Sequence, residues 1–237
     1  LWRVNTLTDV LMQLGSTNTY ADICYMLSQA RSDVAKATQS CNEDNALNSI
    51  QRNIEVLSEL ATVIYRKTPP APAIYFFEKL NKIIERANKE MSDIPIVFKL
   101  STDKPIYEDI PVNISEKLLY VCMFSVLKAM VRCSDRNLFV LSVSVSDNNI
   151  NISSSFSISA DTHTGMIADD FEMYSAKLYI GYIGGKMSYN IKDSIGRLEI
   201  AIPTGDSSTL NSPLYAVPPE TCEKLAGVFM RGIADKK

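Results

Sequence analysis

Few side chains in this sequence could do chemistry, and they are widely spaced. His163 is the only histidine among 237 residues, and it lies in the polar stretch SSSFSISADTHTGM (153–166). The sequence contains no Walker loop and no recognisable nucleophile elbow. No group of His, Cys and Asp residues has the spacing of a metal site. The sequence therefore predicts no catalytic residue, no metal ion and no cofactor.

Three acidic residues form a carboxylate cluster, namely Asp169, Asp170 and Glu172. Neighbouring carboxylates can act as general acid and base. These three stand at the predicted start of a helix, however, where negative charge complements the helix dipole. We interpret them as residues that stabilise the helix.

The cysteines are odd in number, far apart and mostly embedded in apolar helical patterns. This favours buried free thiols over disulfide bonds or a metal site, and the five residues are Cys24, Cys41, Cys122, Cys133 and Cys222.

Charge and hydropathy exclude two classes of partner. The formal net charge is −3, with 24 basic residues that form no basic run, so no nucleic-acid partner is expected. No apolar run approaches the roughly 18 residues of a membrane span, and no signal peptide is recognisable. We expect a cytoplasmic location and no membrane contact by this segment.

Residues 1–68 are predicted to form a helical hairpin. One helix runs from about Tyr20 to Ala37, and the next begins at Asp44 or Asn45 and repeats apolar residues at three and four positions to Ile64. Because a hairpin alone cannot bury a stripe on both faces, we expect a homodimer in which two hairpins form a four-helix bundle. The alternative is a hairpin that packs on its own α/β half.

The stretch KTPPAP (67–72) is the best domain boundary, since its prolines cannot continue a helix. Residues 69–205 follow as one α/β unit, and the tail 206–237 has one further predicted helix over 219–234. This order predicts an α+β fold, a two-layer α/β sandwich behind a dimerisation hairpin. The predicted elements are helices 76–87, 118–132 and 169–182, and strands 96–100, 138–146, 149–153, 155–159, 187–191 and 198–202.

The helix LLYVCMFSVLKAMVR (118–132) is apolar on nearly every turn and lacks Gly and Pro, which predicts a central buried helix. In order and spacing, residues 20–203 resemble the histidine kinase and histidine phosphotransferase superfamily. FFEKLNKIIERANKEMSDIPIVFKL (76–100) is similar to the first helix and strand of the kinase ATP-binding domain, and AKLYIGYIGGKMSYNIKDSIGRLEIAIP (176–203) resembles its closing segment. The resemblance implies a sandwich of the histidine-kinase ATPase type.

The nucleotide motifs of that family are missing. ATP-using members hold Mg²⁺ through an Asn on the central helix, and aligning Ala129 with the family's Asn-Ala pair places Lys128 and, one turn earlier, Phe124 at those positions. Neither residue offers the neutral oxygen ligand that this role requires. Asp161 and Gly165 lack the family's Asp-x-Gly-x-Gly spacing and are interpreted as a surface turn. ATP binding is therefore not expected.

The phosphoacceptor is missing as well. DICYMLSQARSDVAKATQ (22–39) resembles the first bundle helix of ChpT-type phosphotransferases, which relay phosphate and keep the kinase fold without nucleotide chemistry. A relay needs an exposed imidazole there. That alignment places Tyr25 at the acceptor position and Met26 at the acidic one, and alignment with kinases shifts the acceptor position toward Gln29. A tyrosine of pKa ~10 without a neighbouring base is a poor acceptor.

The resemblance thus implies a catalytically silent, homodimeric two-component-type protein that binds a protein partner, such as a response-regulator receiver domain. Receivers dock on such bundles through apolar contacts on the first helix. The partner-binding candidates are Tyr25, Met26, Ser28, Gln29 and Arg31. The alternative is an active phosphotransferase-type enzyme that relays phosphate between response regulators with a misplaced or substituted acceptor.

Overall fold

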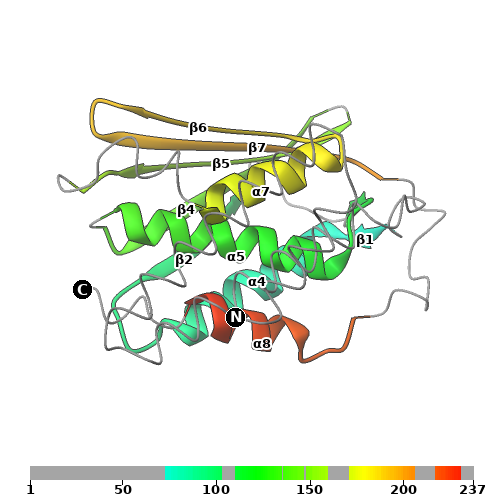
Figure 1. Cartoon of the computed structure of the whole chain (residues 1–237), viewed down its shortest axis with the longest axis horizontal. Helices are drawn as coiled ribbons and strands as arrows, with labels where there is room; N and C mark the ends of the chain where they lie inside the picture. The colour runs from blue at the N-terminus through cyan, green and yellow to red at the C-terminus, as the bar shows by residue number, and fades with distance from the viewer. Residues whose placement is uncertain are drawn as a thin grey trace, which may run out of the picture. The chain divides into compact units, whose positions relative to one another are not determined.

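The computed structural model describes residues 73–102, 110–134, 136–146, 148–159, 171–205 and 217–230. The predicted hairpin 1–68 and the proline-rich boundary lie outside these residues, so both stay predictions. In the described part, a five-stranded sheet is covered by helices on one face (Figure 1). This is the predicted α+β sandwich.

The sheet is mixed. Its strands lie in the order β2, β4, β5, β7, β6, in which β2 and β4 run parallel and all other neighbours run antiparallel. Their bounds are β2 (Val97–Thr102), β4 (Leu138–Ser146), β5 (Asn149–Ser157), β6 (Lys186–Lys192) and β7 (Ile195–Pro203).

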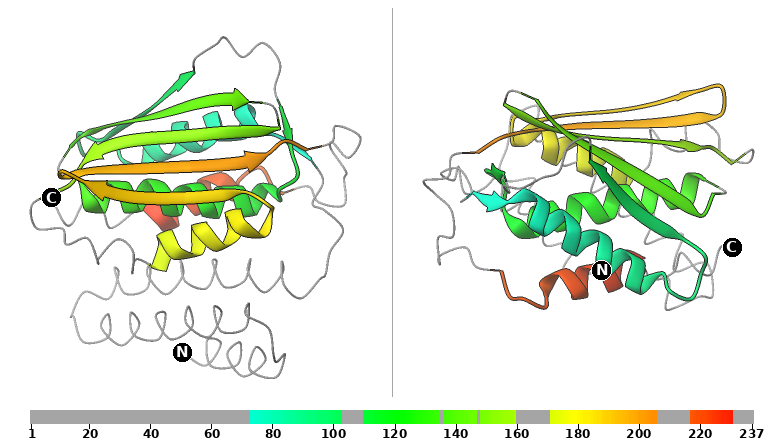
Figure 2. Two further views of the ribbon diagram at one scale, coloured as in Figure 1. Left: turned by 90° about the horizontal axis from the view of Figure 1, so that it is seen from above. Right: turned by 180° about the vertical axis from the view of Figure 1, so that it is seen from behind.

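Three helices, α4 (Phe76–Glu90), α5 (Glu116–Cys133) and α7 (Phe171–Tyr182), cover one face of the sheet. The tail helix α8 (Thr221–Met230) packs on α4 and α5. Figure 2 shows α4 and α5 between the sheet and α8. The prediction of a helix in the tail is confirmed, and its docking on the sandwich is an addition to the expected two layers.

Helix α5 is the predicted central helix. It begins after Ser115, whose Oγ accepts a hydrogen bond from the Leu118 N–H at 3.1 Å and so caps the first turn. Every side chain from Leu118 to Val131 is buried. The apolar pattern on nearly every turn predicted this burial correctly.

Aromatic side chains from β2, β4, β5 and β6 form a row across the sheet. Phe98 and Phe139 stack at 5.5 Å between ring centroids, Phe139 meets Phe156 at 6.0 Å, and Phe156 meets Tyr189 at 6.1 Å. The last pair crosses β7 at Gly196, where a Cβ would lie 2.7 Å from the Tyr189 hydroxyl and 3.0 Å from the Phe156 ring. Glycine is therefore required for this contact.

Backbone geometry explains the turn between β6 and β7 and the end of α7. Asp193 (φ 53°) and Ser194 (φ 59°) both have positive φ, the geometry of a tight two-residue hairpin turn between β6 and β7. Gly184 (φ 81°) ends α7, and the Gly185 N–H donates to the Ile180 carbonyl at 2.8 Å. The predicted Gly-Gly stop after this helix is confirmed.

Two predictions of local structure were wrong. The segments 149–153 and 155–159 form one strand, β5, because Ser154 continues the alternation: its side chain is buried and its hydroxyl donates to the Val140 carbonyl at 2.8 Å. In the predicted loop 102–113, Pro111 and Val112 form strand β3, which pairs with β1 (Ile74–Tyr75). Strands of two residues leave no periodic signal in a sequence.

Candidate functional site

The side of α5 that packs on α8 includes Phe124, which the resemblance aligns with one of the family's asparagines. Phe124 is fully buried, and its ring stacks on Phe229 of α8 with centroids 6.3 Å apart and planes at 26°. Lys128, one turn further along α5, is 5% exposed. The position that the resemblance assigns to a metal ligand is therefore part of an apolar interface between two helices.

Polar contacts at its rim fix α8 on this face. Arg86 of α4 forms an ion pair with Glu223 of α8, and Lys82 Nζ donates to the Pro219 carbonyl at 3.3 Å. Cys222 is fully buried, with Sγ 4.0 Å from the Lys82 carbonyl oxygen. Burial raises the pKa of the Cys222 thiol to about 11, which keeps the thiol neutral and unreactive near neutral pH.

A second polar group lies where α4 meets the start of α5. The buried Tyr120 hydroxyl donates to Glu116 Oε1, and Lys79 Nζ lies 3.3 Å from the same carboxylate oxygen and 3.0 Å from Glu78. Burial and then the Glu116 carboxylate raise the pKa of Tyr120. Burial lowers the pKa of Lys79, but the two carboxylates outweigh it and the net shift is upward. Lys82 Nζ lies 5.8 Å from the Tyr120 ring centroid, within cation–π range.

The ionisable side chains of this group are paired with one another. Tyr120 holds its proton against ionisation, and the Lys79 ammonium is engaged by carboxylates, so neither group is poised as a base or nucleophile near neutral pH. We interpret this group as a structural clamp between α4 and α5.

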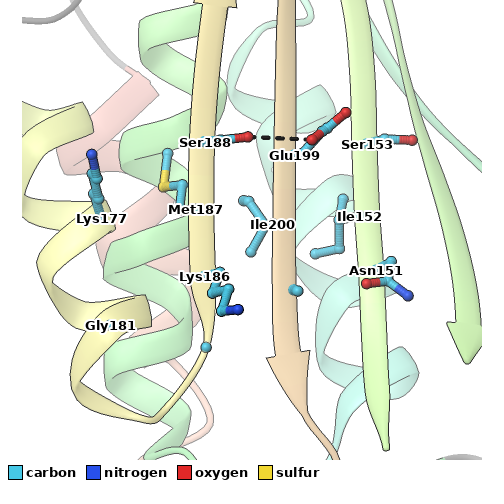
Figure 3. A pocket seen from close by; sticks show the side chains of 12 residues that line it. Asn151, Ile152, Ser153, Lys177, Gly181, Lys186, Met187, Ser188, Glu199 and Ile200 are labelled. Carbon is cyan, nitrogen blue, oxygen red and sulfur yellow. Dashed lines mark hydrogen bonds between the residues drawn. The ribbon is translucent and has the colours of Figure 1, made fainter. Parts of the chain in front are cut away.

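A pocket of about 760 Å³ is lined by residues of β5, β7, β6 and α7 (Figure 3). The Ser188 hydroxyl donates to Glu199 Oε2 at 3.3 Å, and these two residues face each other across β6 and β7. Lys177 and Lys186 also line it. A cross-strand pair on an open surface is ordinary sheet chemistry, and we assign no activity to the pocket.

The receiver-docking candidates from the sequence all lie outside the described residues, and their role stays a prediction. The same holds for the histidine, for the Asp-Gly fragment and for two members of the acidic cluster, whereas Glu172 falls in the first turn of α7. These undescribed candidates are Tyr25, Met26, Ser28, Gln29, Arg31, Asp161, His163, Gly165, Asp169 and Asp170. Among the described cysteines, Cys122, Cys133 and Cys222 are buried thiols that form no disulfide bond, as predicted.

Sequence reasoning missed the partner of Phe124. The available signal was the tail itself, where apolar residues recur at i, i+3, i+4, i+7 and i+8, the pattern of a helix with one buried face. They are Cys222, Leu225, Ala226, Phe229 and Met230.

In the part of the chain that is described, no three His, Cys, Asp or Glu side chains gather as metal ligands. Within the same residues, no helix combines the length and the apolar character that crossing a bilayer requires.

Solved histidine kinases share this architecture. The histidine kinase AdeS of Acinetobacter baumannii superposes with a TM-score of 0.52 at 13% identity, over 76% of this chain and 98% of that chain. A histidine kinase from Burkholderia phymatum STM815 gives 0.50 at 11% identity, over 81% and 100%. The catalytic domain of histidine kinase ThkA gives 0.45 at 13% identity, over 55% and 93%. No protein-family model matches the sequence, and no curated protein matches it.

The fold is therefore of the histidine-kinase ATPase type, with its mixed five-stranded sheet under a layer of helices. Identities this low establish a shared fold only, so activity has to be argued from this chain's own residues.

Proposed function

We propose that this protein is a catalytically silent, homodimeric relative of histidine kinases and histidine phosphotransferases that binds a response-regulator receiver domain. The observation that carries the proposal is the stack of Phe124 on Phe229. By the family alignment, Phe124 stands at an asparagine position of the nucleotide helix. A magnesium nucleotide would have to displace α8 to reach that position.

The side-chain chemistry of Phe124 and Lys128 supports the same proposal. Mg²⁺ needs oxygen ligands, which neither a phenyl ring nor an ammonium group supplies. Lys128 is also buried, so its charge could not be moved aside to water without repacking α5. A retained fold with an altered site favours recognition of a protein over transfer of a phosphoryl group.

Receiver binding is assigned to the predicted first bundle helix, by resemblance to the phosphotransferases that keep this fold. Its contact candidates are Tyr25, Met26, Ser28, Gln29 and Arg31. Transient signalling contacts of this kind bury small interfaces and need only modest affinity.

The test is a titration of the intact protein against a panel of receiver domains. We expect one receiver to bind at micromolar affinity, and Met26→Arg to weaken it at least about tenfold by placing a charge in an apolar contact. The matched control is Val97→Arg, which puts the same side chain on a residue that is 42% exposed on the sheet and leaves binding unchanged. Absence of binding to every receiver would contradict the proposal.

The same materials test the alternative that the protein is an active phosphotransferase. Phosphorylated receiver is incubated with the protein, and the protein is analysed for an added phosphoryl group by intact mass. The proposal predicts no transfer. A phosphorylated residue on this chain would show an active relay and overturn the assignment of silence.

A further inference from the structure

Three exposed apolar side chains lie together on the face of the sheet opposite the helices. Val97 of β2 pairs with Leu138 of β4, and Val140 follows two residues further along the same side of β4. The exposed fractions of Val97, Leu138 and Val140 are 42%, 49% and 39%. Figure 2 (left) looks onto this face, and we call the three residues the β2–β4 patch. Single exposed apolar residues are normal on a protein, whereas a contiguous group is typical of an interaction surface.

The side chains at the border of the patch are positively charged. Lys99 of β2 stands directly opposite Val140 in the ladder, so the two side chains share one face of the sheet. Arg136 precedes Leu138 by two residues, and its Nε donates to the Ser157 hydroxyl at 2.9 Å. Both cations are exposed. The patch is therefore an apolar surface with two cations at its border.

The neighbouring strands supply no negative charge to balance these cations. Strands β2, β4 and β5 contain neither Asp nor Glu, and apart from the patch and Lys99 their outward positions hold only serine and asparagine. Further across the sheet, the Glu199 carboxylate of β7 accepts a hydrogen bond from Ser188 at 3.3 Å. The whole chain has 27 acidic and 24 basic residues, so this face is more positive than the chain as a whole.

The edge of β2 beside the patch is closed to an added strand. Asn88 of α4 covers the backbone of Phe98 on the side away from β4: its Oδ1 accepts from the Phe98 N–H at 2.8 Å, and its Nδ2 donates to the Phe98 carbonyl at 3.0 Å. A partner strand would have to break both hydrogen bonds to pair with β2. A partner therefore reaches the patch through the face of the sheet, by side-chain contacts.

Charge complementarity selects the partner. In a two-fold contact between two copies of this chain centred on the patch, Lys99 and Arg136 would each approach their own image. Like charges that meet across an interface oppose association, whereas opposite charges favour it. A partner that presents carboxylates around apolar side chains covers the patch and pairs with both cations.

We propose that the β2–β4 patch binds an acidic segment of a partner protein. Apolar side chains of that segment cover Val97, Leu138 and Val140, and its carboxylates reach Lys99 and Arg136. The site is separate from residues 1–68, to which receiver docking is assigned, so the two proposals can fail separately. Because the charges are exposed, salt weakens this association.

The test titrates the intact protein with a short labelled peptide in which glutamates flank a group of leucines. Binding is followed by fluorescence anisotropy. We expect saturable binding that weakens at least about threefold when the ionic strength rises from about 0.05 M to about 0.5 M. Two control peptides should not bind: one has lysine in place of each glutamate, and the other has serine in place of each leucine.

Matched variants of the protein locate the binding site. Leu138→Ser should weaken binding of the glutamate peptide about tenfold or more, since an apolar contact is lost; Val97→Ser replaces this variant if thermal unfolding shows that it does not fold. Val140→Ser should also weaken binding, whereas Val145→Ser, a residue of 46% exposure at the other end of β4, should not. Lys99→Glu should weaken binding of the glutamate peptide and create binding of the lysine peptide.

Four results overturn the proposal. The first is a glutamate peptide that does not bind, and the second is binding that Val140→Ser and Val145→Ser weaken equally. The third is flotation of the protein with phosphatidylserine vesicles that Leu138→Ser abolishes, which would assign the patch to a lipid surface. The fourth is a dimer of the unchanged protein that Leu138→Ser dissociates in sedimentation, which would assign the patch to a second copy.

Discussion

Phe124 of α5 and Phe229 of α8 stack with ring centroids 6.3 Å apart, and neither ring is exposed to solvent. The contact joins the central helix of the sandwich to the tail that follows the last strand. It makes the side of α5 that faces away from the sheet part of the hydrophobic core. The contact therefore contributes to stability and closes this side of α5.

Phe229→Ala should lower the free energy of unfolding by about 3–5 kcal/mol, because it removes a fully buried ring and leaves a cavity against Phe124. Urea denaturation of the intact protein measures the change. Lys224→Ala in the same helix is exposed and should shift stability by less than about 0.5 kcal/mol. A loss below about 1 kcal/mol for Phe229→Ala would argue against a docked α8.

Gly196→Ala should destabilise the sheet by about 1–3 kcal/mol. The added methyl would lie 2.8 Å from Ile158 Cδ1 and 2.7 Å from the Tyr189 hydroxyl, so the aromatic row must shift. Gly181→Ala is the matched control. A Cβ there meets nothing within 4 Å and helical alanine is favoured over glycine by roughly 0.5–1 kcal/mol, so this variant should be neutral or stabilised. The thermal midpoints of the two variants should shift in opposite directions. Equal decreases in the two midpoints would contradict the packing described.

Removing the side-chain hydroxyl should affect stability differently at two tyrosines. The Tyr189 hydroxyl oxygen is buried without a hydrogen-bond partner, so Tyr189→Phe should be neutral or slightly stabilising. The Tyr120 hydroxyl donates to the Glu116 carboxylate, and Tyr120→Phe should cost about 1.5–3 kcal/mol. Chemical denaturation distinguishes the two. A clear destabilisation by Tyr189→Phe would reveal a partner for that hydroxyl.

Stability should fall in alkali. Burial raises the pKa of Cys122 from 9.0 to about 12 and that of Cys222 to about 11. Above about pH 9 the unfolded chain releases these thiol protons while the folded chain retains them, so stability is complete below that pH and declines as pH rises toward the folded values. Tyr120 and Lys79, whose pKa values are also raised, act in the same direction at higher pH.

The alkaline decline is measured as the urea midpoint at about pH 8 and about pH 10.5. A protein in which both Cys122 and Cys222 are replaced by alanine should lose less stability over this interval than the unchanged protein. An identical decline in the two proteins would mean that these two thiols do not cause the loss of stability in alkali.

Local periodicity was sufficient to predict most of the elements in the described residues. Alternation located β4, β6 and β7, and unbroken apolar character predicted that α5 is buried. The continuity of β5 through Ser154 was missed because a buried serine needs a hydrogen-bond acceptor, Val140, that only the folded sheet supplies.

The site was predicted only in part, for a similar reason. The alignment of Phe124 and Lys128 with the family's asparagines stays a prediction. The helix that covers Phe124 was not predicted, since the pattern of α8 specifies that one face is buried but not which surface buries it. Tertiary partners of amphipathic helices depend on shape and charge at a distance in sequence, here Arg86 opposite Glu223.

Calorimetric titration of magnesium ATP into the intact protein tests the central claim most directly. Because Phe229 covers Phe124 on α5, and neither Phe124 nor Lys128 offers an oxygen ligand, we predict no saturable heat up to roughly millimolar nucleotide and no rise in the thermal midpoint. Saturable binding of one nucleotide per chain, accompanied by a higher thermal midpoint, would contradict the account.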